Sequence, residues 1–400
     1  MSLRRVIAVF GLFALLLAGC DGPAAPSGDA STSAGPTVAA APALRPVWQS
    51  LTLPTPPGGV GRLLVRDVAA CTGRWFLVGG VADAAGDTRP AAWTSVDGTG
   101  WTVLPVRADS FYGKQNVLSS VACRDGRAAV IGAKVGGAHG NPRVSTWRQV
   151  ADGALVEVQA SFETYGGPKA VNVSRLASGP SGWLIVGNRS AGAASWVSSP
   201  AAAEFALVEG APGLASDATG VTWAFDAAAT SSGWLAVGGL LPAGRIDRDP
   251  AVWSSPDGRS WQRTVLPGGP EYEELQRVVL AGGVPVAVGL RGATFGAWRQ
   301  EAAGWVAAGA FGRRSGAGVP QVASLVASGD RLFAAVTDGA RYSVWVSTDR
   351  GGSWREAALP LEVAAGADRD VALVAVGDRW WLAVDDGSRS GLWWAGGVGA

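Results

Sequence analysis

Few residues of this sequence could do acid–base or nucleophilic chemistry, and they are widely separated. Tyr272 stands between Glu271 and Glu273, and a carboxylate beside a phenol can take its proton and make it a nucleophile. His139 is the only histidine, and no second ligand lies at metal-binding spacing from it, which predicts a loop histidine rather than a metal site. Gly-x-Ser-x-Gly, phosphate-loop and dinucleotide-binding motifs are missing. The sequence therefore predicts no enzyme, no metal and no cofactor, and a hydrolase alternative depends on Tyr272.

Cationic and aromatic side chains that could bind a ligand recur at one place in a repeated unit. An arginine follows the second of four predicted strands in each repeat: Arg89, Arg143, Arg189, Arg248, Arg291, Arg341 and Arg389. Three of the four tyrosines lie in segments between repeats: Tyr112, Tyr165 and Tyr272. Both kinds of segment reach the same face of the predicted fold, so we expect a binding face there. In the alternative, the arginines pair with nearby acids such as Asp87, Asp247 and Asp249.

The elements that position these residues belong to a sequence repeat. An apolar run ending in Val-Gly or its equivalent recurs seven times, as in RWFLVGG (74–80) and GWLAVGG (233–239). A tryptophan follows each run: Trp93, Trp147, Trp196, Trp253, Trp298, Trp345 and Trp393. The period is about 45 to 57 residues with four short strands in each unit, which is typical of propeller blades. We predict an all-β, seven-bladed β-propeller of four-stranded antiparallel blades over residues 46–400.

The two ends of this domain predict that its ring is closed by the N-terminal strand. The last repeat contains a third strand but no fourth, whereas VWQSLTLP (47–54) resembles the fourth strands WTVLP, WQRTVLP and WREAALP of other repeats. We expect residues 47–54 to pair beside residues 390–395. That pairing would complete the last blade and remove an open sheet edge.

A polar turn between two tryptophans recurs between the third and fourth strands. It reads WTSVDGTGW (93–101), WSSPDGRSW (253–261) and WVSTDRGGSW (345–354), and in it Asp can accept backbone N–H groups while Gly closes the turn. The motif residues are Ser95, Asp97, Trp101, Ser255, Asp257, Trp261, Ser347, Asp349 and Trp354. This turn resembles the Asp box of the BNR-repeat propellers, which include sialidases and photosystem assembly factors. The resemblance implies a structural role for these residues, on the face opposite the ligand site.

The same resemblance implies two alternative functions. A sialidase-like glycoside hydrolase uses three arginines on the substrate carboxylate, a Tyr activated by a Glu, and an Asp as acid/base, and Tyr272 with its flanking glutamates could supply some of these groups. However, the early Arg-Ile-Pro motif of that family is missing here, and Tyr272 and its glutamates are adjacent in sequence rather than drawn from separate blades. The second alternative is an assembly factor for a membrane complex.

The N-terminal residues predict export and lipid attachment. Two arginines precede an apolar run that is too short to span a bilayer comfortably and that ends in Leu-Ala-Gly-Cys at Cys20. This pattern is typical of a bacterial lipoprotein signal peptide (1–19), whose processed Cys20 carries the acyl chains that give stable membrane attachment. A secretory signal cleaved near Gly19 is the alternative. Residues 20–45 are rich in Ala, Pro and Ser and predict a disordered tether.

Two further cysteines, Cys71 and Cys123, end the first strands of neighbouring repeats. An oxidising compartment permits a disulfide between them. Equivalent positions of adjacent blades can, however, lie farther apart than the limit of roughly 7 Å between Cα atoms. The sequence leaves open a disulfide or two buried free thiols.

Composition excludes some classes of function. The net charge is +1 without a run of basic residues, so nucleic acid is not expected as a partner. A hydrophobic fraction of 48% indicates a globular chain rather than a disordered one. We expect a monomeric, non-enzymatic binding or scaffold module for a glycan or protein partner, anchored by lipid on the extracytoplasmic side of the cell envelope.

Overall fold

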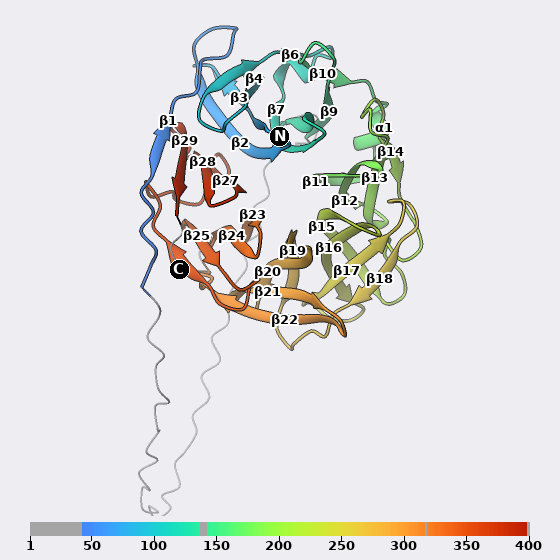
Figure 1. The fold of residues 1–400 in the computed structure, drawn as a ribbon. Coiled ribbons are helices and arrows are strands. Elements are labelled where there is room, and N and C mark those ends of the chain that lie inside the picture. Colours follow the sequence, from blue (N-terminus) through green and yellow to red (C-terminus); the bar gives the residue numbers. More distant parts are fainter. Residues whose placement is uncertain (1–41, 137–141, 317, 398–400) are drawn as a thin grey trace, which may run out of the picture. The chain divides into compact units, whose positions relative to one another are not determined.

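Short apolar strands separated by tight turns build seven antiparallel sheets around a common centre. The computed structural model describes residues 42–136, 142–316 and 318–397. The innermost strands of the sheets are β2, β7, β11, β15, β19, β23 and β27 (Figure 1). The prediction of a seven-bladed β-propeller with antiparallel blades is confirmed.

The first four blades follow one another along the chain. Blade 1 comprises β2 (Arg62–Cys71), β3 (Arg74–Ala82), β4 (Thr88–Ser95) and β5 (Trp101–Leu104). Blade 2 comprises β7 (Val117–Arg124), β8 (Arg127–Lys134), β9 (Arg143–Gln149) and β10 (Leu155–Val158), with β6 (Val106–Arg107) parallel to β10. Blade 3 comprises β11 (Ala170–Gly179), β12 (Gly182–Arg189), β13 (Gly192–Ser198) and β14 (Ala206–Val208). Blade 4 comprises β15 (Gly220–Thr230), β16 (Gly233–Pro242), β17 (Asp249–Ser255) and β18 (Gln262–Val265).

The remaining blades continue this order, and the last one takes its outer strand from the N-terminal side. Blade 5 comprises β19 (Glu273–Ala281), β20 (Val284–Arg291), β21 (Thr294–Glu301) and β22 (Gly304–Phe311). Blade 6 comprises β23 (Gln321–Ser328), β24 (Arg331–Thr337), β25 (Tyr342–Ser347) and β26 (Arg355–Ala357). Blade 7 comprises β27 (Asp370–Val376), β28 (Arg379–Asp385), β29 (Ser390–Gly396) and β1 (Gln49–Leu51). A 3₁₀ turn η1 (Gly113–Gln115) precedes β7, and the short helix α1 (Phe162–Tyr165) precedes β11.

Antiparallel pairing sorts the connections onto two faces. The connections between second and third strands and those between blades share one face, which we call the loop face. The third-to-fourth turns, which include the Asp boxes, lie on the opposite face, which we call the box face. Three of the repeat tryptophans fix connections on the loop face. Their buried indoles donate from Nε1 to a backbone carbonyl in the segment that leads into the same blade. The pairs are Trp93 with Pro54, Trp196 with Thr164 and Trp253 with Gly213.

Neighbouring blades are joined near the centre by polar contacts as well as apolar packing. At four junctions a side chain that directly follows a bulge in the inner strand accepts from a backbone N–H of the next blade. The pairs are Asp67 with Val121 (2.9 Å), Ser120 with Leu176 (3.3 Å), Asp226 with Val278 (3.1 Å) and Ser324 with Leu373 (3.1 Å). Each of these side chains gives an inner-strand N–H of the next blade a hydrogen-bond partner from outside its own sheet.

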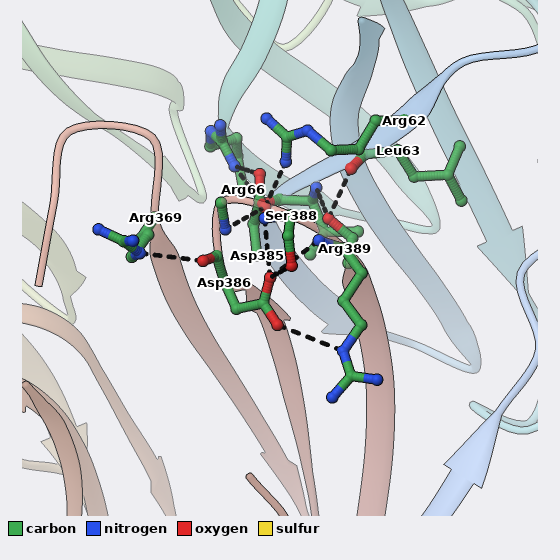
Figure 2. Close-up of polar contacts among 11 residues, drawn as sticks. Arg62, Leu63, Arg66, Arg369, Asp385, Asp386, Ser388 and Arg389 are labelled. Carbon is green, nitrogen blue, oxygen red and sulfur yellow. Dashed lines mark hydrogen bonds and ion pairs between the residues drawn. The ribbon is translucent and has the colours of Figure 1, made fainter. Parts of the chain in front are cut away.

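At the other three junctions a different side chain accepts from the N–H of a neighbouring blade. The position that is Asp or Ser at the first four junctions is Arg175, Arg277 or Ala372 here, and none of these side chains can accept a hydrogen bond. Asn188 accepts from the N–H of Ala224 (2.8 Å), Gln276 from Val322 (2.7 Å) and Ser390 from Val65 (3.2 Å). Every junction of the ring therefore has at least one hydrogen bond from an inner-strand N–H of one blade to a side chain of a neighbouring blade. The bond from Val65 to Ser390 joins blade 1 to blade 7 and closes the ring, and Figure 2 shows Arg62 and Arg66 bonded to Asp385 at the same junction.

The N-terminal segment closes the ring as predicted. In β1, Gln49, Ser50 and Leu51 pair antiparallel with Trp394, Trp393 and Leu392 of β29. Trp48 packs on Trp380 with ring centroids 4.5 Å apart and donates to the carbonyl of Ala358. Just before it, Leu44 bonds through both backbone groups to β26 and its neighbour Ala358. Contacts to blades 6 and 7 thus begin ahead of the predicted domain start at residue 46.

The Asp boxes are tight turns that pack on the preceding blade. In the first box Asp97 Oδ1 accepts from Ser95 Oγ (2.9 Å) and from two backbone N–H groups of the turn, and those N–H groups hold the pKa of Asp97 well below its ordinary value. Gly98 has φ +77°, and a Cβ there would lie 2.7 Å from Trp381 of blade 7. The second and third boxes repeat these bonds through Ser255 with Asp257 and Ser347 with Asp349. The turns thus act as contacts between blades.

Cys71 and Cys123 form a disulfide between blades 1 and 2. Their Cα atoms are 5.9 Å apart, within the limit of roughly 7 Å for a bridge, so of the two alternatives that the sequence leaves open the structure has the disulfide. Inner strands of adjacent blades approach each other closely at the box face, where both residues lie, and this brings the two side chains within bonding reach.

Deleting residues 46–54 should destabilise the propeller strongly, because the deletion removes the outer strand of blade 7 and the packing of Trp48 on Trp380. We expect the free energy of unfolding to fall by about 3 kcal/mol or more, since Trp48, Leu51 and Leu53 are partly buried against blades 7 and 1 and each loses apolar contacts worth about 1 kcal/mol. Denaturant unfolding of the two deletion variants measures this, with deletion of residues 22–40 as the control. Equal unfolding midpoints would contradict the closure.

Candidate functional site

Most of the predicted arginines on the loop face are neutralised by acidic side chains. The pairs are Arg189 with Glu209 (3.0 Å), Arg248 with Glu274 (2.7 Å), Arg291 with Glu273 (3.2 Å), Arg341 with Glu356 (3.6 Å) and Arg389 with Asp386 (3.3 Å). Figure 2 shows the pair of Arg389 and Asp386. It lies beside the buried Asp385, which forms ion pairs with both Arg62 and Arg66 at 2.6 Å. The acids are not the predicted Asp87, Asp247 or Asp249. Because each charge is compensated within its own surroundings, the arginines do not form one cationic ring.

Arg89 and Arg143 differ from the other five. Arg89 donates to the carbonyls of Pro57 (3.1 Å) and Gly59 (2.6 Å) and so holds the segment that leads into β2. Arg143 makes no hydrogen bond or ion pair through its guanidinium with any residue that the structure describes, and its Nε is buried without a partner. Its guanidinium carbon instead lies 5.4 Å from the ring centroid of Tyr112 and 4.7 Å from that of Phe162. Arg143 is therefore the predicted arginine that remains available to a ligand.

A groove at the junction of blades 2 and 3 surrounds Arg143. It has a larger compartment of about 410 Å³ and a smaller one of about 170 Å³, and Arg143, Phe162 and Tyr165 line both of them. The helix α1 forms one wall, and hydrogen bonds to β9 and β13 hold this helix in place. Tyr165 is buried with its hydroxyl 3.1 Å from the hydroxyl of Thr146, and the carbonyl of Thr164 accepts from Trp196 at 2.6 Å. The wall of the groove is thus held in place without a ligand.

The two compartments differ in chemistry. Beyond the shared residues, the larger one is lined mainly by apolar side chains, among them Ile131, Ala133, Pro168, Val171 and Val173. The smaller one is richer in polar side chains, namely Ser110, Ser145, Glu157, Gln159 and Ser161, and also contacts Val158 and Ala160. An apolar cavity with a few fixed polar groups is the usual form of a small-molecule site.

Glu157 is the anionic group of the smaller compartment. Its carboxylate accepts from the hydroxyls of Ser110 (2.7 Å) and Ser145 (2.8 Å) and from the backbone N–H groups of Asp109 (2.9 Å) and Ser110 (2.8 Å). Burial alone would raise the pKa of Glu157, but these hydrogen bonds outweigh burial and lower that pKa below its ordinary value. Glu157 is therefore ionised at neutral pH and fixed in position.

The two other predicted tyrosines lie in different surroundings. Tyr112 is 39% exposed at the mouth of the groove. Tyr272 lies near the start of blade 5 and donates to Glu274 (2.6 Å), while Arg248 donates to both Tyr272 (3.0 Å) and Glu274 (2.7 Å). Burial and the charge of Glu274 raise the pKa of Tyr272. The carboxylate beside this phenol is thus Glu274, not the flanking Glu271 or Glu273.

Charged residues of the inner strands form a second cluster that sequence reasoning missed. Its members are Arg66, Asp67, Arg175, Asp226, Arg277 and Asp370, which act on one another electrostatically. Asp67 pairs with Arg175 at 3.3 Å, and each of Asp67 and Asp226 also accepts the interblade N–H described above. Charged residues within otherwise apolar first strands, as in VRDVAAC (65–71), were the available signal. Positive and negative members are equal in number, so we assign this cluster a structural role.

Some predictions lie outside the described residues or concern the whole fold. His139 and Cys20 are outside the described residues. Within residues 42–136, 142–316 and 318–397, no helix is long and apolar enough to cross a membrane. The same residues contain no group of three or more His, Cys, Asp and Glu side chains that could hold a metal ion.

The chain is similar to known proteins in its fold and not in its sequence. No family model matches the chain, and no curated protein matches it in sequence. Among solved structures, a puromycin hydrolase is 16% identical with a TM-score of 0.50, over 81% of this chain and 50% of that one. A puromycin-hydrolyzing peptidase of Mycobacterium tuberculosis is 12% identical with a TM-score of 0.49, over 81% and 49%. A Hadza microbial sialidase is 12% identical with a TM-score of 0.43, over 84% and 66%. The chain spans about half the length of the puromycin hydrolase, and their likeness is one of propeller fold.

The central charges predict a pH-dependent stability. Burial raises the pKa of Asp370 from about 3.8 to about 6, so between these values the folded state keeps a proton that the unfolded state has lost. The contribution of Asp370 to the free energy of unfolding should therefore fall as pH rises through this window and level off above it.

Asp370→Asn removes this titration and keeps the side-chain oxygen that accepts from the N–H of Val371. The variant should gain stability relative to the natural protein as pH rises from about 4 to about 7. Denaturant unfolding across this range measures the difference. Curves that stay parallel at every pH would show that Asp370 does not titrate in this window.

Proposed function

We propose that this chain is a non-enzymatic binding module of the cell envelope that holds an anionic ligand, borne by a glycan or a protein, in the groove at blades 2 and 3. The observation that carries the proposal is Arg143. It is partly buried, it lies between two aromatic side chains, and it has no anionic partner among the described residues. Its guanidinium makes no hydrogen bond or ion pair with a described residue, Glu157 included, and an unsatisfied donor that is partly removed from water is costly. An anionic ligand would accept from these donors.

The point at which the described chain begins agrees with this use of the loop face. The carbonyl of Pro42 accepts from Arg355 (3.1 Å), the first residue of β26, directly after the third Asp box. The described chain therefore joins the propeller at the box-face end of blade 6. The groove lies on the loop face, which is the opposite face of the propeller from this point.

A hydrolase is the second candidate, because Tyr272, Glu274 and Arg248 contact one another. Two features of the geometry favour it less. Arg248 is the one arginine that contacts this tyrosine among the described residues, where the sialidase resemblance implies three arginines for a substrate. Glu274 is also engaged by Arg248 and by Gln276 (2.7 Å). These bonds stabilise the carboxylate and leave it less able to take the phenol's proton.

Arg143→Gln should weaken binding of carboxylate-bearing cell-wall fragments by about tenfold to a hundredfold, since a hydrogen bond to a charged group is worth about 1.5–3 kcal/mol. Calorimetric titration of the two proteins with the same fragments measures this loss. Binding to the natural protein should also weaken as salt rises.

Arg389→Gln is the matched control, because Arg389 lies on the same face but is exposed and already paired with Asp386. Its affinity should stay within about twofold of the natural protein's, since a surface ion pair contributes little. Equal losses in the two variants would mean that the groove is not the site and that the face binds only through its general charge.

Cys20→Ser should move the protein from the membrane fraction to the soluble fraction, because the change removes the thiol to which acyl chains would be attached. Fractionation followed by immunoblotting measures the distribution. The double variant Cys71→Ser with Cys123→Ser is the control and should stay with the membrane. A Cys20→Ser protein that remains membrane-bound would disprove the lipid anchor.

A further inference from the structure

The groove at blades 2 and 3 has a mainly apolar larger compartment and a smaller compartment that is richer in polar side chains, and Arg143 lines both of them. From this difference we infer that its ligand is a small monocarboxylate with an apolar body, whose carboxylate binds Arg143 and whose body fills the larger compartment. The inference rests on the proposed function and narrows it from anions in general to one chemical class.

The surroundings of Arg143 favour a planar, bidentate acceptor. Tyr112 and Phe162 contact the guanidinium through their rings, at 5.4 and 4.7 Å from their centroids. Such contacts involve the faces of a guanidinium and leave its N–H groups, which lie in its plane, for hydrogen bonds. A carboxylate presents two oxygens with the matching geometry. The Nε–H is buried without a partner, and the two Nη groups make no hydrogen bond or ion pair with a described residue. A carboxylate would accept from the two Nη groups.

The larger compartment determines the size and the apolar character of the ligand's body. Its volume of about 410 Å³ falls within the range of about 300–1,000 Å³ that is usual for small-molecule sites. Ile131 and Val144 line it from blade 2, and Val171 and Val173 line it from blade 3. Val171 is 45% exposed at the rim, whereas Ile131 is buried. A phenyl or branched alkyl group would cover this apolar surface and remove it from water.

The smaller compartment limits the charge of the ligand. Glu157 is ionised and saturated with hydrogen-bond donors, and no described cation pairs with it. A second anionic group on the ligand would therefore meet a fixed like charge beside Arg143. This repulsion favours a ligand with a single carboxylate over an anionic polymer.

The test uses three probes that separate charge from apolar area. N-acetyl-L-phenylalanine carries both features, its C-terminal amide lacks the charge, and N-acetylglycine lacks the apolar body. Calorimetric titration of the full chain should show binding of N-acetyl-L-phenylalanine at least about tenfold tighter than either of the others, because each lacks one of the two contacts.

Two kinds of variant connect the binding to the groove. Arg143→Gln should remove the advantage of the acid over its amide. Ala133→Phe should fill the larger compartment and remove the advantage of the phenyl group, and Val171→Glu at the exposed rim should do the same if Ala133→Phe does not fold. Arg389→Gln should leave all three affinities unchanged. Thermal melts identify which variants are folded.

The possible failures can be told apart. If N-acetylglycine binds as tightly as N-acetyl-L-phenylalanine and Arg143→Gln weakens both, the apolar class is wrong and the proposed anion site stands. If the amide binds as tightly as the acid and Arg143→Gln changes neither, the inference and the proposed function are both wrong. If no probe binds through Arg143, the monocarboxylate class is overturned, and the titration with cell-wall fragments then decides the proposed function alone.

Discussion

A closed set of hydrogen bonds from inner-strand N–H groups to side chains of neighbouring blades is the constraint on which the rest of this molecule depends. At each junction a side chain accepts from a backbone N–H of the neighbouring blade, four times from the position after a bulge and three times from a substitute such as Asn188. An inner-strand N–H without such a partner would cost about 1–3 kcal/mol. The seventh contact forms only when blade 7 meets blade 1, which the pairing of β1 with β29 supports from the outside.

The loop face is less regular than the ring of junctions, and the groove lies at one of its irregular places. Indoles at equivalent positions of blades 1, 3 and 4 hold their loops through Nε1, whereas Trp147 of blade 2 has no partner for Nε1 among the described residues. The chain inserts α1 between β10 and β11 at the next junction. Blades 2 and 3 therefore stay joined near the centre through Ser120 and Leu176 but are separated near the loop face, where the two compartments lie.

The fold could be predicted from the sequence because its strongest signals repeat. The period, the Asp boxes and the borrowed strand of VWQSLTLP each follow from local residue types. The partners of the arginines could not be predicted in the same way. The fourth strand of a blade brings Glu209 to Arg189 and Glu356 to Arg341, and no local sequence pattern shows this. The distance between Cys71 and Cys123 depends on how closely inner strands approach, which no local pattern encodes. Arg143 was predicted as one of seven equal residues, and only the structure distinguishes it by its missing partner.

The central claim is that Arg143 is left without an internal partner so that it can bind an external carboxylate. A crystal structure of the full chain with N-acetyl-L-phenylalanine tests it most directly. The account predicts a carboxylate within hydrogen-bond distance of the Arg143 guanidinium, with the phenyl ring among Ile131, Val144 and Val173. A structure in which an acidic side chain of the protein itself occupies that position, with the larger compartment empty of ligand, would contradict it.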